Sequence, residues 1–334
     1  MTRMPDSEML ANERRDHRNQ KVREAALRFK NLPRDYPDLA EVFTQYAAAH
    51  VAAMKAVLGN DVDKEEEEAS ARGETRKLIE HNAQDLIAEA ARLSQVLNAK
   101  MRSLGLPPNY LQPRWDCPKC QDTGWIGREK CECEKARERE RLFAASRMPE
   151  EAREHRFAKG GWPKDAAKVV AFARDFSAGK DPGVGFYLAG NVGAGKTYLF
   201  DCIVNVLIEN MKSVLYLRDI DFFNELRITG DGAREDRLEM VKEVDYLLID
   251  NLGAARPTSW VRETMFNVLD YRYRHHKATA FTSNMKLYDL AMFLATPSDK
   301  PEAGYRDSLG EAIASRISQM CQVMTMPGGD RRMK

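Results

Sequence analysis

The residues best suited to chemistry form one run, Gly190-Asn191-Val192-Gly193-Ala194-Gly195-Lys196-Thr197. The run satisfies the pattern G-x-x-x-x-G-K-[ST], and it follows an apolar strand-like stretch and precedes a helical one, as a phosphate-binding loop requires. Glycines let backbone amides wrap phosphate groups, Lys196 can reach the β and γ oxygens, and Thr197 can ligate Mg²⁺. The sequence therefore predicts a site for a nucleoside triphosphate with magnesium, whose cradle consists of Gly190, Asn191, Gly193, Ala194 and Gly195.

Polar residues that could complete this site end two later strand-like runs. The run Tyr246-Leu247-Leu248-Ile249 ends in Asp250, which is placed to bind magnesium as the Walker B acid. The next residue is Asn251, at a position where many hydrolytic P-loop proteins carry a second acid. Because an amide can orient water but cannot take its proton, we expect hydrolysis to be slow. Asn284, at the end of the run 278–284, is the natural sensor of the γ-phosphate.

Four cysteines form a second chemical set. Cys117, Cys120, Cys131 and Cys133 follow the pattern CxxC-x10-CxC, which suits tetrahedral Zn²⁺. Four thiolate ligands leave no open position, so the metal would be structural. The alternative, a redox CxxC, leaves Cys131 and Cys133 unexplained. Cys202 and Cys321 lie in apolar stretches of helical texture, and we expect both to be core thiols.

The chain divides into three stretches of different texture. From about residue 146 to residue 334, short apolar runs alternate with helical segments, which predicts an α/β fold with a parallel sheet and crossover helices. Residues 113–145 form the zinc-binding module and a connector helix. Residues 1–112 are predicted to be helical throughout, and an all-α domain of this kind is better suited to docking a partner than to chemistry.

The helical stretch carries two apolar series with spacings of three and four residues. The first series runs over residues 38–58 and the second over residues 79–104, and together they predict an antiparallel helical hairpin. An earlier short helix around Val22, Ala26 and Phe29 should support it. We expect the second series to form a seam, with members Ile79, Ala83, Leu86, Ala90, Leu93, Leu97, Met101 and Leu104.

Composition excludes several classes of protein. Fifty-two Lys and Arg against 51 Asp and Glu leave a formal charge of +1, so a polyanionic partner must bind a local patch. The chain shows neither a signal-peptide core nor a run of apolar residues long enough to span a membrane, and its six cysteines are too few for a disulfide framework. We therefore expect a cytoplasmic protein that does not bind membranes.

Several of these segments together resemble one known family. CPKCQDTGWIGREKCECEKARERERLFAASRMP, GNVGAGKT, YLLIDNLGA, RPTSWVRETMFNVLDYRY and FTSN look like the bacterial and phage replicative helicase loaders, the DnaI/DnaC group, over roughly Cys117 to Arg332. The resemblance implies an AAA+ module with ATP as its nucleotide. It also implies that Arg316 is the arginine finger and that Arg331 or Arg332 is sensor II. The family's usual pair of acids is Asp-Asp, from which Asn251 departs.

The resemblance implies a function as well. A loader of this kind places a hexameric DnaB-type replicative helicase onto single-stranded DNA at the initiation of DNA replication, and ATP binding and hydrolysis switch its contacts with helicase and DNA. The helical N-terminal domain would dock the helicase, and the loader would form a homo-oligomer on it. Two alternatives remain open: an IstB-like transposition ATPase that binds duplex DNA and a transposase, and a weakly hydrolysing, nucleotide-responsive scaffold.

Overall fold

The computed structural model describes residues 7–58, 74–180, 185–299 and 307–331, with the backbone alone for residues 7, 57–58 and 74–83. The described residues separate into two compact units, an N-terminal one that ends at Cys131 and a C-terminal one that begins at Glu132. The connector helix α5 (Glu132–Ser146) thus belongs to the C-terminal unit, whereas the sequence grouped it with the cysteines. The physical reason is burial, because Leu142 and Phe143 at the end of α5 lie in the core of the C-terminal unit.

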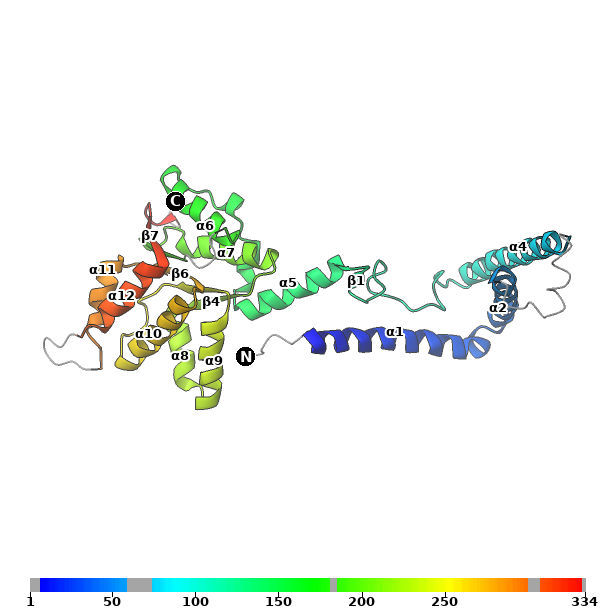
Figure 1. The fold of residues 1–334 in the computed structure, drawn as a ribbon, viewed down its shortest axis with the longest axis horizontal. Helices are drawn as coiled ribbons and strands as arrows, with labels where there is room; N and C mark the ends of the chain where they lie inside the picture. Colours follow the sequence, from blue (N-terminus) through cyan, green and yellow to red (C-terminus); the bar gives the residue numbers. More distant parts are fainter. Residues whose placement is uncertain (1–6, 59–73, 181–184, 300–306, 332–334) are drawn as a thin grey trace. The chain divides into compact units, whose positions relative to one another are not determined.

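A five-stranded parallel sheet forms the centre of the C-terminal unit (Figure 1). The strand order is β4-β5-β6-β3-β7, and every pairing is parallel. This confirms the predicted α/β P-loop architecture, with the strand before the phosphate loop lying between β6 and β7. The strands are β3 (Gly185–Gly190), β4 (Val214–Arg218), β5 (Tyr246–Asp250), β6 (Ala278–Ser283) and β7 (Cys321–Met326).

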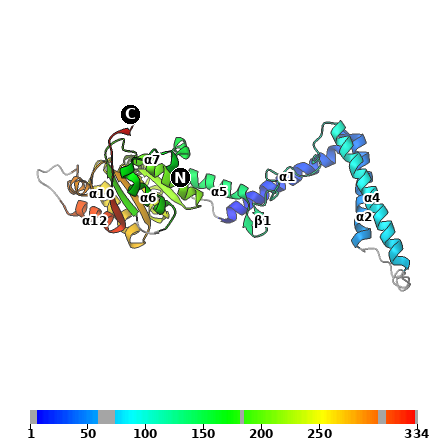
Figure 2. The same cartoon turned by 90° about the horizontal axis from the view of Figure 1, so that it is seen from above.

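Alternate residues of the strands face two separate cores, so the sheet is covered on both faces (Figure 2). Phe186 and Leu188 of β3 face one core, which also receives α5, α6 (Ala167–Ser177) and α7 (Lys196–Glu209). Tyr187 and Ala189 face the other core. Its helices are α8 (Asp219–Ile228), α9 (Asp231–Glu243), α10 (Ser259–Arg274), α11 (Leu287–Ala295) and α12 (Leu309–Met320).

Two details of this unit differ from the sequence interpretation. Cys202 is buried in α7 as expected, but Cys321 begins strand β7 and does not lie in a helix. Three short 3-10 helices lie between α5 and α6, at Glu150–Glu154, Phe157–Lys159 and Lys164–Ala166. The segment that contains them passes the start of α7, and its residues Gly160 and Gly161 contact Arg331.

The N-terminal unit consists of α1 (Ser7–Asp35), α2 (Pro37–Leu58) and α4 (Glu74–Ser103). The Lys100 ammonium of α4 lies 2.9 Å from the carboxylate of Asp38 at the start of α2, so the two helices run antiparallel as predicted. The helix before them was expected to be short and is 29 residues long. Among the described seam residues, Ala90, Leu93, Leu97 and Met101 are buried, whereas Leu104 is exposed because the helix has already ended.

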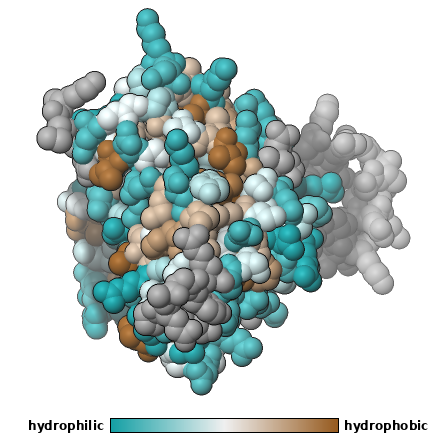
Figure 3. All heavy atoms as spheres, turned by 90° about the vertical axis from the view of Figure 1, so that its left-hand side faces the viewer, coloured by the Kyte–Doolittle hydropathy of each residue, from teal (hydrophilic) through white to brown (hydrophobic). Residues whose placement is uncertain are grey.

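Between the two cysteine pairs, β1 (Trp125–Ile126) and β2 (Glu129–Lys130) form a small antiparallel hairpin. In the described part of the chain, no helix combines the length and apolarity that crossing a bilayer demands. Figure 3 shows the end of the C-terminal unit that carries α11 and α12, where hydrophilic side chains dominate and apolar ones stand in small groups.

Candidate nucleotide site and cysteine cluster

The phosphate loop joins the end of β3 to the start of α7, which begins at Lys196. Gly193 and Gly195 have φ angles of +74° and +97°, a region that side chains other than glycine's rarely adopt. Gly190 has a second requirement, because a Cβ atom there would lie 2.9 Å from the carbonyl oxygen of Met326. The glycines that the motif specifies are thus demanded by the backbone, and they leave the loop amides beside the N-terminus of a helix, where anions bind.

The Lys196 side chain lies inside this loop. Its ammonium donates hydrogen bonds of 2.8 Å each to the carbonyl oxygens of Gly190 and Asn191 and to the side-chain oxygen of Asn284. The side chain is 7% exposed, and burial lowers the pKa of Lys196. A buried ammonium whose present partners are neutral oxygens is well suited to a phosphate, which would form stronger, charge-assisted bonds.

Asp250, the last residue of β5, is held by three hydroxyl groups. Thr197 Oγ1 lies 3.1 Å from Asp250 Oδ2, Tyr216 OH donates to the same oxygen at 3.0 Å, and Thr282 Oγ1 donates to Oδ1 at 2.5 Å. Burial raises the pKa of Tyr216, so its hydroxyl stays protonated as a donor. The carboxylate and the Thr197 hydroxyl offer neighbouring oxygen ligands of the kind that Mg²⁺ prefers, so the residues fit a magnesium-bound nucleotide.

Sequence reasoning did not find Tyr216 or Thr282. Both lie within apolar strands, on β4 and β6, where a tyrosine or threonine reads as a core residue. Position gives a usable signal for Thr282, which lies near the carboxyl end of β6, at the edge where Asp250 ends β5. Tyr216 is the middle residue of β4, so its position gives no such signal.

Asn251 and Asn284 complete a chain of hydrogen bonds. Asn284 accepts from Lys196 with its oxygen and donates with Nδ2 to Asn251 Oδ1 at 3.0 Å. Asn251 has a φ angle of +58°, and its backbone N–H donates to Thr282 Oγ1 at 2.9 Å. Asparagine tolerates this left-handed conformation better than most residues do. The structure therefore brings the two asparagines and Lys196 together.

The arginines are placed differently from one another. Arg331 reaches the phosphate loop: its backbone N–H donates to the Gly193 carbonyl at 3.0 Å, and its guanidinium donates to the carbonyls of Gly160 and Gly161. Arg316 instead donates to Asp270 Oδ1 at 2.9 Å and lies over the ring of Tyr273, so these contacts tie it to α10. Arg332 lies outside the described residues.

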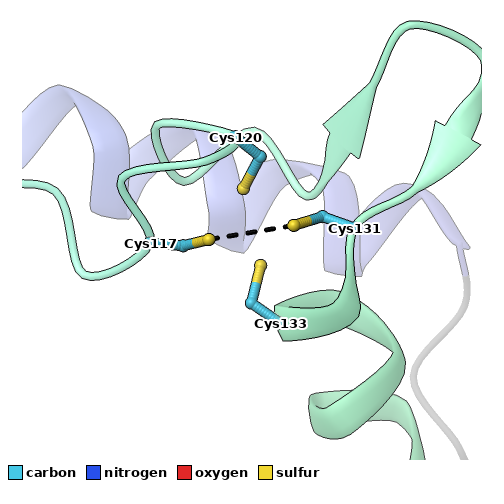
Figure 4. A group of neighbouring side chains, drawn as sticks. All are labelled: Cys117, Cys120, Cys131 and Cys133. Carbon is cyan, nitrogen blue, oxygen red and sulfur yellow. Dashed lines mark hydrogen bonds between the residues drawn. The ribbon is translucent and has the colours of Figure 1, made fainter.

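The cysteine sulfur atoms converge (Figure 4). The sulfur atoms of Cys117, Cys120, Cys131 and Cys133 all lie within 4.8 Å of one another, and those of Cys117 and Cys131 are 3.8 Å apart. Four sulfurs at about 2.3 Å from a tetrahedral Zn²⁺ stand about 3.8 Å from one another, so the donor set fits the ion. All four thiols point to one centre, which a two-cysteine redox motif does not require.

A buried carboxylate shapes the first knuckle. Asp122 has a φ angle of +59°, and its side chain accepts the backbone N–H of Cys117 at 2.7 Å and that of Asp116 at 3.0 Å. The His17 ring of α1 lies 2.8 Å from the other carboxylate, that of Asp116. The knuckle is thus anchored to α1 within the N-terminal unit.

Comparison with known proteins places this geometry in a family. The model of the family described as "IstB-like ATP binding protein" matches residues 137–334, more than half of the chain. The chain belongs to this family. The IstB-like region includes the whole sheet and the whole nucleotide site, so the chain is an AAA+ ATPase with a P-loop, as the resemblance implied.

Three relatives from Bacillus subtilis (strain 168) are similar in sequence to this chain. The uncharacterized protein YqaM is 31% identical over 219 residues, which cover 61% of this chain and 64% of YqaM. The phage-like element PBSX protein XkdC is 29% identical over 230 residues, 62% of this chain and 80% of XkdC. The replicative helicase loader DnaI is 38% identical over 153 residues, 45% of this chain and 48% of DnaI. The matches thus span less than two thirds of YqaM and about half of DnaI.

Among solved structures, a crystal structure of DnaI is 30% identical in sequence, with a TM-score of 0.48 over 56% of this chain and 95% of that one. The resemblance to the DnaI/DnaC group is confirmed by the sequence relatives, which also include the helicase loader DnaC of Buchnera aphidicola at 27% identity.

Proposed function

We propose that this chain is an ATP-dependent loader of a hexameric replicative helicase, acting on single-stranded DNA at the initiation of replication. In this proposal, ATP switches the loader between two states. The observation that supports this role is the chain of hydrogen bonds from Lys196 through Asn284 to Asn251. The similarity to DnaI and DnaC, which are replicative helicase loaders, supports a replicative helicase as the partner that this switch would control.

A bound ATP–magnesium complex would supply the γ-phosphate that Asn284 contacts. Lys196 exchanges its three neutral acceptors for phosphate oxygens, and this releases the oxygen of Asn284. Asp250 and Thr197 would hold the magnesium, and Asn251 would orient the attacking water without taking its proton. Turnover is therefore slow, and the ATP state persists long enough to act as an assembly signal.

Arg316 completes the site of a neighbouring copy in this proposal. Its guanidinium is restrained by Asp270 and Tyr273 on α10, which presents it as a fixed group and not as a mobile side chain. Arg331 already lies at the loop of its own chain and serves as sensor II. The loader would accordingly act as a homo-oligomer.

Single-stranded DNA would bind a pocket of the C-terminal unit lined by Arg227, Arg234, Arg256, Thr258 and Trp260 together with Ser298 and Asp299. Guanidinium groups bind phosphates, and an indole offers a face for a base. The Arg234 guanidinium is held by the carbonyl oxygens of Leu226 and Thr229, which fixes one charge in place. In a chain of net charge +1, this pocket is the kind of local patch that a polyanion needs.

The helicase would dock on the N-terminal unit. A groove between α2 and α4 is lined by Tyr46, His50, Met54 and Ile87, among other residues, and Met54 and Ile87 are about half exposed. Exposed apolar side chains around a groove are typical of protein-binding surfaces. The cysteine cluster, with zinc bound, would stiffen the C-terminal end of this unit.

The test is direct. The full chain is mixed with a hexameric DnaB-type helicase and analysed by size-exclusion chromatography with and without ATP. We expect a complex, and we expect Lys196→Ala to abolish its response to ATP while the exposed-surface control Lys212→Ala retains it. Absence of any complex would reject the loader function.

The family assignment favours one second candidate, a transposition ATPase, because the matching family is described as IstB-like. Such a protein should form ATP-dependent filaments on duplex DNA. Electron microscopy of the chain with duplex and single-stranded DNA separates the two functions.

A further inference from the structure

The C-terminal segment 328–331 lies against the phosphate loop of the same chain. The Arg331 backbone N–H donates to the Gly193 carbonyl at 3.0 Å, and Asn191 Nδ2 donates to the Gly328 carbonyl at 3.3 Å. Hydrogen bonds at both ends of the segment therefore fix it to the loop that receives phosphate.

Between these two anchors lies the carboxylate of Asp330. It approaches Gly193 so closely that a Cβ atom on that glycine would lie 2.0 Å from Oδ1 and 2.7 Å from Oδ2. Gly193, at a φ angle of +74°, is thus required both by the turn of the loop and by this contact. A group of negative charge packs on the part of the chain where the sequence motif places a triphosphate.

The loop attracts anions because its amides and the N-terminus of α7 present positive potential. The same potential acts on a carboxylate of the chain itself. A triphosphate in the loop would add several negative charges to the loop that Asp330 contacts, and like charges in such proximity repel each other. The carboxylate and the nucleotide cannot share this place without a cost in binding free energy.

We propose that Asp330 competes with the phosphates of the nucleotide for the phosphate loop, and so sets the affinity of the site and moves the C-terminal segment when nucleotide binds. The inference deepens the nucleotide site and rests on nucleotide binding there, but it does not depend on any helicase.

Displacement of Asp330 reaches a second part of the molecule through the next residue. The Arg331 guanidinium donates to the carbonyls of Gly160 and Gly161 at 2.7 and 2.6 Å and lies 5.5 Å from the ring centre of Trp162. The Trp162 indole in turn donates to the Phe157 carbonyl at 2.7 Å. A shift of Asp330 therefore loosens or redirects Arg331, the sensor II candidate, at the moment when phosphate arrives.

The test uses Asp330→Asn in the full chain, because asparagine keeps the shape and removes the charge. A fluorescent ATP analogue with Mg²⁺ is titrated into wild type and variant at low and high salt. We expect the variant to bind ATP roughly tenfold more tightly at low salt, with a smaller gain for ADP and a gain that shrinks as salt screens the repulsion. The matched control is Asp231→Asn, whose side chain is 99% exposed at the start of α9 and should leave the affinity unchanged.

Equal affinities of wild type and Asp330→Asn for ATP would overturn the proposal, and so would a gain that does not respond to salt. A wild-type chain that binds no nucleotide would instead refute the site itself. The titration of wild type therefore separates failure of the competition from failure of the nucleotide site.

Discussion

The ammonium of Lys196 and the side-chain oxygen of Asn284 lie 2.8 Å apart, although 88 residues separate them in the chain. The contact joins the phosphate loop to the end of β6, so one hydrogen bond reports whether the loop lysine is engaged by the protein or by a ligand. In the proposed function, binding of the γ-phosphate to Lys196 breaks this hydrogen bond.

The first prediction concerns Asn284. In Asn284→Ala, Lys196 keeps its two carbonyl acceptors, so ATP binding should stay within a few-fold of wild type. Hydrolysis should fall roughly tenfold to a hundredfold, because the variant loses the group that positions the γ-phosphate and that holds the side chain of Asn251. Binding and single-turnover measurements on the same samples separate the two effects. Loss of binding with normal turnover per bound ATP would contradict the assigned role.

The second prediction concerns Asn251. Asn251→Asp keeps the oxygen that accepts from Asn284 and adds a group that can take a proton from water. We expect turnover to rise roughly tenfold or more, since a positioned general base contributes on the order of a hundredfold or more in favourable cases. The control is Asn224→Asp, an exposed position on α8. Unchanged turnover would contradict the expectation that Asn251 limits hydrolysis.

The third prediction concerns Tyr216, which donates to Asp250 Oδ2. Tyr216→Phe removes one hydrogen bond from the carboxylate that holds magnesium, a loss of about 1 kcal/mol. The concentration of Mg²⁺ needed for half-maximal ATP hydrolysis should rise roughly fivefold. Tyr187→Phe is the matched control, because its hydroxyl also donates from a buried strand, but to the Met285 carbonyl. An equal effect of both variants would show a general loss of stability and not a role at Asp250.

The glycines of the phosphate loop and the strand ends around it can be predicted from the sequence, because both obey local rules. Buried parallel strands read as continuous apolar runs, and polar residues such as Asp250 and Asn284 mark where those runs end. The glycines of the loop can also be predicted from the sequence, since the backbone conformation at Gly193 and Gly195 requires them. These signals need no knowledge of distant contacts.

The features that escaped prediction depend on tertiary contacts. Strand β7 lies at the edge of the sheet and exposes Gln322 and Val323, so it lacks the apolar run of a central strand. Helix α1 is strongly charged, and its partners, such as the carbonyls of Tyr110 and Gln112 that Arg28 binds, lie more than 80 residues away. No local pattern reveals that the tail reaches Gly193.

The fourth prediction concerns the cysteines. The purified chain should contain one Zn²⁺ per molecule by elemental analysis, and Cys117→Ser should lose it, because a closed site needs all four thiolates. Removal of zinc by a chelator should make residues 113–131 sensitive to proteases. Cys202→Ala is the control, since that thiol is buried in α7 away from the cluster. Zinc content that survives in Cys117→Ser would refute the four-cysteine site.

The last prediction concerns pH and the joint between α5 and the rest of its unit. Glu225 of α8 accepts two hydrogen bonds from Arg147, just after α5, and pairs with Arg237 of α9. The hydrogen bonds from Arg147 and the nearby charges lower the pKa of Glu225 to about 2. A lowered carboxyl pKa means that the stabilisation is present above the unfolded value near 4.5 and is lost as pH falls towards 2.

Glu225→Gln should therefore lower the free energy of unfolding by about 1–2 kcal/mol at neutral pH, a figure reduced from the full shift because the side chain is partly exposed to solvent. The difference in Tm between wild type and Glu225→Gln should shrink as the pH is lowered from 5 to 3. In this range the Glu225 carboxylate of the unfolded wild-type chain becomes protonated, and this lowers the contribution of Glu225 to the free energy of unfolding. Glu235→Gln, an exposed position on α9, serves as control and should leave Tm unchanged. A Tm difference that stays constant across this range would show that Glu225 stabilises the joint by packing and not by its charge.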